Sequence, residues 1–285
     1  MALIEPSETP MTHEPAAMVL ALLAHAAEQL VLMDDYLGRR GIRLHGSIHE
    51  ARKAIRRFRA AFALCGAADD PRASAVDHTA QRLGRSLSKL RDAHVLVQLA
   101  SKRLKGYDAN GSRRPWRFVH ERLKKTRDDL ASATLKADPE FERRRARARA
   151  LQKAFASLTC DALTPEAVLL LLRQSSARVR RAERACQQHV TQGARHRYRR
   201  RLRRLRMQLQ CVTALAHEMS VPKEAQLQAR WVLREALDTM PGINELDALV
   251  TALGGRQDGE MLRRVVRRLP ESAHRRTLVS AIEGK

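Results

Sequence analysis

Aromatic and acidic residues are both scarce in this chain of 285 residues. Phe, Trp and Tyr make up 4% of it, which leaves few rings on which unpaired nucleic-acid bases could stack. Lys and Arg number 54 against 31 Asp and Glu, so the formal net charge is +23. This excess is far larger than solubility requires, and it predicts a polyanionic partner.

Cysteines and long apolar runs are also few. The four cysteines show no C-x-x-C spacing and no Cys/His cluster, so we expect free thiols in a reducing cytosol and no metal site. The most apolar stretch, Met18 to Met33, contains His25 and Glu28 and is shorter than the roughly 20 residues that a membrane span needs. The first residues carry acids instead of the basic start of a signal peptide. We therefore expect a cytoplasmic protein without membrane insertion.

Motifs of catalysis are missing as well. The chain has no Walker A loop, no G-x-G-x-x-G, no H-E-x-x-H and no nucleophile elbow. Its acids are dispersed, without the carboxylate cluster that would hold the Mg²⁺ of phosphoryl transfer. The sequence thus predicts no catalytic residue and no cofactor, and a phosphohydrolase or nucleotide-binding enzyme is the weakest of the functional classes left open.

What the chain does contain is helical periodicity. Leucine and alanine recur at three- and four-residue spacing almost throughout, strand signals are absent, and hydrophobic residues reach 44%, enough for a folded core. Glycine and proline clusters divide this pattern. The expected helices cover residues 12–38, 46–65, 71–104, 114–136, 139–159, 165–190, 194–218, 223–239, 244–253 and 258–269, with a short one after Pro270.

Two stretches that begin 147 residues apart, at His49 and His196, share the pattern H-x-x-R-(R/K)-x-x-R-R-(F/L)-R. At 100° per residue, the second to fifth basic positions fall at about 300°, 40°, 340° and 80° from the histidine, so one side of each helix is cationic and the other is apolar. We call these stretches the two ladders. Their basic residues are His49, Arg52, Lys53, Arg56, Arg57 and Arg59, and His196, Arg199, Arg200, Arg203, Arg204 and Arg206.

The ladders predict an anion-binding surface. A charge run is usually a solvated helix face with internal ion pairs, but here the neighbours at three- and four-residue spacing are almost all cationic and repel one another by a few tenths of a kcal/mol per pair. A row of guanidinium groups can bind several phosphate oxygens at once. His49 and His196 have two open interpretations, a structural hydrogen bond or a donor to phosphate.

A second repeat follows each ladder. Leu90 to Val97 and Ile243 to Val250 each place a polar-acidic pair before an apolar run. We expect Asp92 and Glu245 to orient ladder arginines, with helix capping or ordinary ion pairing as the equal alternative. Lys89 and Arg91 would extend the basic surface.

The repeats predict one domain over residues 12–270, made of two pseudo-symmetric halves. The halves cover 12–136 and 164–270, and the segment 137–163 connects them. Within this connector we interpret the arginine-rich stretch Arg143 to Arg149 as solvated. If both ladders bury their apolar sides, their cationic sides could converge between the halves, although periodicity cannot establish this.

The chain closely resembles the CHAD family, the conserved histidine α-helical domains. The resemblance lies in the two ladders, in the R-D-x-x-V-L motif from Arg91 to Leu96 and in the all-helical layout. The resemblance implies an all-α fold of two four-helix bundles around a basic central pore or groove, and binding of inorganic polyphosphate. It implies that the first five basic residues of each ladder line the ligand surface. Some relatives also carry a CYTH domain with an E-x-E-x-K signature, which does not occur here.

The leading functional hypothesis is therefore a polyphosphate-binding protein that acts in storage or at polyphosphate granules. The alternative is an RNA- or DNA-binding protein that recognises the phosphate backbone. Nothing in the sequence predicts an oligomeric state.

Overall fold

The computed structural model describes residues 16–66, 70–106, 113–158, 163–268 and Leu278. The described residues are helical almost throughout and include no strand, as the periodicity predicted. The helices are α1 (Ala17–Gly38), α2 (Leu44–Phe62), α3 (Pro71–Ser86), α4 (Ser88–Lys105), α5 (Arg113–Ala137), α6 (Glu142–Ala156), α7 (Pro165–Gln188), α8 (Gln192–His217), α9 (Lys223–Leu237) and α10 (Ile243–Arg267), with short 3-10 helices η1 (Gly41–Arg43) and η3 (Pro139–Phe141).

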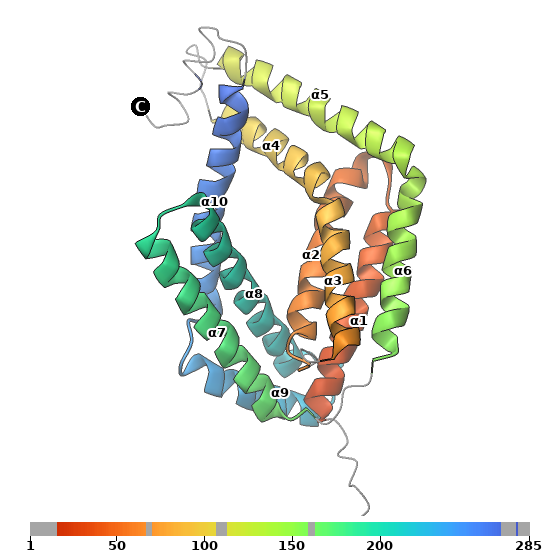
Figure 1. Cartoon of the computed structure of the whole chain (residues 1–285), viewed down its shortest axis with the longest axis vertical. Helices are drawn as coiled ribbons and strands as arrows, with labels where there is room; N and C mark the ends of the chain where they lie inside the picture. Colours follow the sequence, from red (N-terminus) through yellow and green to blue (C-terminus); the bar gives the residue numbers. More distant parts are fainter. Residues whose placement is uncertain (1–15, 67–69, 107–112, 159–162, 269–277, 279–285) are drawn as a thin grey trace, which may run out of the picture.

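Helices α1 to α6 lie on one side of the molecule and α7 to α10 on the other (Figure 1). The apolar sides of the two ladder helices, α2 and α8, face a single hydrophobic core. Phe58 of α2, Leu205 of α8 and Leu22 of α1 are fully buried in this core. Because the core draws on both sides of the molecule, burial of apolar area ties them together. The expected pseudo-two-fold relation between the halves stays a prediction.

A second, smaller apolar cluster lies where α4, α5 and α10 meet. Trp116 and Val119 of α5 pack there with Leu262 and Val266 of α10, and all four are buried. Since α4 and α5 belong to the first half of the chain and α10 to the second, this cluster is another apolar contact between the halves.

Three expected helices differ from the structure. The helix expected over 71–104 is broken at the buried Leu87 into α3 and α4, and the two helices expected over 244–253 and 258–269 are one helix, α10. The glycines at 254–259, interpreted as breakers, lie inside α10. One of them makes room for an arginine described below. Residues 12–15 of the first expected helix, and most of the segment after Pro270, lie outside the described residues.

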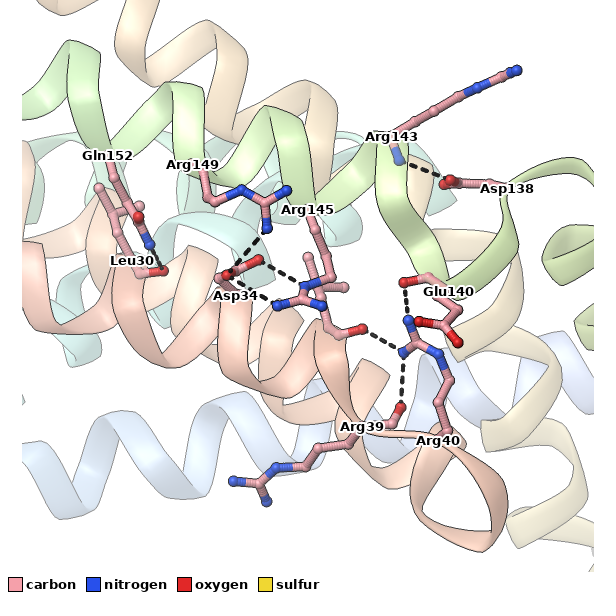
Figure 2. A network of polar contacts seen from close by, with 11 residues as sticks. Leu30, Asp34, Arg39, Arg40, Asp138, Glu140, Arg143, Arg145, Arg149 and Gln152 are labelled. Atoms are coloured by element: carbon pink, nitrogen blue, oxygen red, sulfur yellow. Dashed lines mark hydrogen bonds and ion pairs between the residues drawn. The ribbon is translucent and has the colours of Figure 1, made fainter.

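Helix α6 is not a solvated connector, which corrects the interpretation of Arg143 to Arg149. It packs on α1 and α3 and buries Leu151 and Phe155. Figure 2 shows Asp34 of α1 between two arginines of α6, with its carboxylate 3.1 Å from Arg145 Nε and 3.7 Å from Arg149 Nη1. These cations therefore hold helices together, whereas Arg147 is exposed.

Helix α1 is longer than the apolar stretch recognised in the sequence. Its 22 residues and mean hydropathy of 1.5 make it long and apolar enough to cross a membrane by length and composition. In the fold, however, its buried residues pack against α2, α6 and α9.

Candidate functional site

The cationic sides of both ladders line one cavity of about 450 Å³, which we call the central cavity. Five helices supply its walls: α2, α3, α4, α8 and α10. Its charged lining consists of eight arginines and two aspartates, together with two histidines. These residues are His49, Arg52, Arg56, Arg59, Arg85, Arg91, Asp92, His196, Arg199, Arg200, Arg203 and Asp258.

On the α2 side, neutral groups hold Arg52 in place. Arg52 Nη1 donates to the carbonyl oxygen of Gly84 at 2.8 Å and to the hydroxyl of Ser88. The break between α3 and α4 explains this contact, because the last carbonyls of a helix lack intrahelical partners. Since these partners carry no negative charge, the positive charge of Arg52 remains available to an anion.

On the α8 side, a glycine and an amide position Arg199. Its Nη1 donates to Gln257 Oε1 of α10 at 2.8 Å. A Cβ at Gly254 would lie 2.7 Å from Arg199 Nη2, closer than atoms pack, so the guanidinium lies where only glycine leaves space. Gln257 and Gly254 were not among the predicted site residues.

Between these two walls, Arg56 and Arg203 form no hydrogen bond or ion pair with any described residue. Burial, and then the neighbouring Arg203, lower the pKa of Arg56 to about 9. Burial, and then Arg199 and Arg52, lower the pKa of Arg203 to about 10. Both groups stay charged at neutral pH, so the ligand-free cavity holds uncompensated positive charge.

The two histidines of the ladders are neutral in this arrangement. Arg91 Nε donates to His49 Nδ1 at 2.9 Å, so the proton of His49 is on Nε2. Burial and the charge of Arg91 lower the pKa of His49, and burial and the charge of Arg200 lower that of His196. The bond to Arg91 fits the structural interpretation of His49, and the proton on Nε2 is free for the other interpretation, donation to an oxyanion.

Two carboxylates from opposite halves share the cavity. Burial raises the pKa of Asp92, against the opposing effect of Arg52 and Arg91, and the charge of Asp258 raises it further. Burial also raises the pKa of Asp258, against the opposing effect of Arg199 and Arg91. Asp258 was not predicted as a site residue, because the surrounding glycines were interpreted as breakers between two helices. The adjacent pair Gln257-Asp258, which resembles Arg91-Asp92, was the signal that could have identified it.

Six predicted residues lie outside the cavity lining, and the first four are Lys53, Arg57, Lys89 and Glu245. Lys53 is 3.4 Å from Glu50, and Arg57, Lys89 and Glu245 are exposed. On α2 the cavity side is centred near 300° from His49, whereas Lys53 and Arg57 lie at about 40° and 80°. An orienting role for Glu245 finds no contact with a ladder arginine among the described residues.

The remaining ladder arginines have other neighbours. Arg59 lines the cavity but its Nε donates to Asp77 at 2.7 Å, and Arg206 pairs with Asp247 of α10, two residues after Glu245. Arg204 lines a recess of about 120 Å³ that adjoins the cavity and shares Arg56 and Arg59 with it. The described residues contain no group of three or more histidine, cysteine, aspartate or glutamate side chains that could hold a metal ion.

The fold and cavity define an all-helical protein in which both halves of the chain surround an arginine-lined cavity. A family model described as the CHAD domain matches residues 21–267, and the chain therefore belongs to the CHAD domain family. The crystal structure of the CHAD domain from the plant Ricinus communis is similar in fold, with 19% sequence identity and a TM-score of 0.59 over 99% of this chain and 91% of that chain. No curated protein matches the chain.

Proposed function

We propose that this protein binds inorganic polyphosphate in the central cavity. The observation that carries the proposal is a pair of half-buried arginines, Arg56 and Arg203, which form no ion pair with a described residue. They come from different ladders and line the same cavity. Burying like charges costs free energy unless an opposite charge compensates them. A linear chain of phosphates supplies one negative charge per unit with no side group to accommodate.

The shape and chemistry of the cavity favour polyphosphate over nucleic acid. A single-stranded nucleic acid would bring sugars and bases, and its binding sites commonly offer aromatic rings for stacking. None of the described lining residues is Phe, Trp or Tyr. A duplex could not place its phosphates inside a cavity of about 450 Å³, because its major groove alone is about 12 Å wide.

Competition at about physiological salt tests the proposal. Labelled long-chain polyphosphate is titrated with the protein and then displaced by unlabelled polyphosphate, single-stranded or duplex nucleic acid. We expect Arg56→Glu and Arg203→Glu to weaken polyphosphate binding about tenfold or more each. The exposed Arg147 provides the control, since Arg147→Glu changes net charge equally without touching the cavity. Equal losses in all three variants, or nucleic acid that polyphosphate cannot displace, would refute the proposal.

We propose further that the protein binds without turnover and localises to polyphosphate granules. Incubation with Mg²⁺ and polyphosphate, followed by a phosphate assay, tests the first point, and sustained release would overturn it. A fluorescent fusion tests the second, because the Arg56→Glu variant should leave the granules while the Arg147→Glu variant should remain there.

A further inference from the structure

Two further cavities lie beside the central cavity along α8 and α10. The central cavity shares His196, Arg199 and Gln257 with a pocket of about 270 Å³, which we call the α8–α10 pocket. That pocket in turn shares Gln192 and Glu260 with an open groove of about 460 Å³ on α10. Because neighbouring cavities share wall residues, the three lie next to one another along α8 and α10.

The third of these cavities, the α10 groove, is also cationic. It is lined by Gln192, Glu260, Arg263, Arg264, Arg267 and Arg268. The single carboxylate of this lining, Glu260, already accepts a hydrogen bond from Arg195 at 2.7 Å. Arg264 donates to the neutral amide of Gln192 at 3.1 Å, so its charge is not compensated there.

We propose that the α10 groove is a second binding segment for the same linear ligand. The inference rests on the proposed function of the central cavity. A chain held in the cavity passes through the α8–α10 pocket and places further phosphates among the groove arginines. Binding of the second segment is then intramolecular and favoured by a high effective concentration, whereas a short chain can occupy only one segment.

Charge reversal in the groove tests this inference. Affinities for tripolyphosphate and for long-chain polyphosphate are measured with wild type and with the double variant Arg263→Glu/Arg264→Glu. We expect the variant to lose about tenfold or more in long-chain affinity, and to bind tripolyphosphate at the cavity within about twofold of wild type. A long chain can bind in many registers, which raises its apparent affinity. Dividing the affinity of the variant by that of wild type at each chain length removes this effect.

Two further variants control for charge and for folding. Arg147→Glu/Lys153→Glu on α6 makes the same change in net charge at two exposed positions, and both affinities should be retained. Because Arg263 is half-buried, the milder pair Arg264→Gln/Arg268→Gln at exposed positions should show a smaller loss confined to long chains. Equal losses at both lengths in the groove variants, or no loss at either, would overturn the inference. Failure of wild type to bind either length would instead overturn the proposed function.

Discussion

Arg56 of α2 and Arg203 of α8 line one cavity and form no ion pair with any described residue, although they come from ladders 147 residues apart. Arg203 is, after burial, the strongest cause of the lowered pKa of Arg56. Their folded-state pKa values of about 9 and about 10 lie below the ordinary value of 12.5. At neutral pH both arginines are charged in the folded and unfolded states. The lowered pKa values therefore mean that their charge destabilises the ligand-free fold. This destabilisation decreases only as pH rises through the folded pKa values, where the arginines lose their charge in the folded state.

Neutralising one of these arginines should therefore stabilise the ligand-free protein. Arg56→Met keeps the apolar stem of the side chain and removes the repulsion with Arg203. We expect a higher melting temperature, by about 2–4 °C for each kcal/mol relieved, together with loss of most of the stabilisation that polyphosphate gives wild type. Thermal unfolding with and without polyphosphate measures both. Arg147→Met is the control, and a melting temperature lower than that of wild type in Arg56→Met would contradict the prediction.

Two neighbouring glycines of α10 offer a matched test of how Arg199 is positioned. A Cβ at residue 254 would lie 2.7 Å from Arg199 Nη2, whereas a Cβ at residue 255 meets nothing within 4 Å. Both Gly254→Ala and Gly255→Ala should gain helix propensity, up to about 1 kcal/mol.

Only Gly254→Ala should displace Arg199 from Gln257, because the new methyl group occupies the place of the guanidinium. We expect it to weaken polyphosphate binding about threefold to tenfold while Gly255→Ala binds as wild type. Titration calorimetry with both variants measures this. The same affinity in both would show that the position of Arg199 does not depend on Gly254.

Periodicity predicted the core of the site and failed at its edges for a physical reason. It identified the sides of α2 and α8 that carry Arg52, Arg56, Arg199 and Arg203, since burial of the apolar side leaves the cations opposite. It could not identify which edge of each cationic side turns inward, because that depends on how the helices pack. Lys53 was therefore included although it lies outside the lining.

The contribution of α10 was beyond the reach of the sequence for a related reason. Glycine usually ends a helix, but Gly254 is retained within one because Arg199 of another helix occupies the space of its missing side chain. Arg199 and Gly254 are 55 positions apart, so the pattern of neighbouring residues does not predict their contact. The sequence therefore placed Gln257 between two expected helices and Asp258 at the start of the second one, and it predicted no contact of either with Arg199.

Some arginines of this chain should affect stability and leave binding unchanged. Arg145 of α6 contacts Asp34 of α1 (Figure 2), and neither residue lines the central cavity. We expect Arg145→Ala to lower the free energy of unfolding by about 1 kcal/mol, since the pair is partly exposed, and polyphosphate affinity to stay within about twofold. Denaturant unfolding and titration measure the two effects. A tenfold loss of affinity would show that net charge, and not the cavity, determines binding.

Binding should take up protons at the two cavity carboxylates. An acid whose pKa is raised by folding, as for Asp92 and Asp258, favours the fold at low pH and loses that contribution as pH rises through the folded pKa. A bound polyanion raises these pKa values further, and it raises the lowered pKa of His49 and His196 as well. Affinity should therefore fall as pH rises from about 5 to about 7.

The variant Asp258→Asn isolates one part of this titration. It removes a negative charge that faces the bound phosphates, so we expect binding at neutral pH to tighten by about threefold to tenfold. It should also flatten the pH profile, and the remaining slope should come from Asp92 and the histidines. Asp238→Asn, at an exposed position after α9, should leave the profile unchanged. Weaker binding in Asp258→Asn would mean that this carboxylate positions Arg199 or Arg91 for the ligand instead of repelling it.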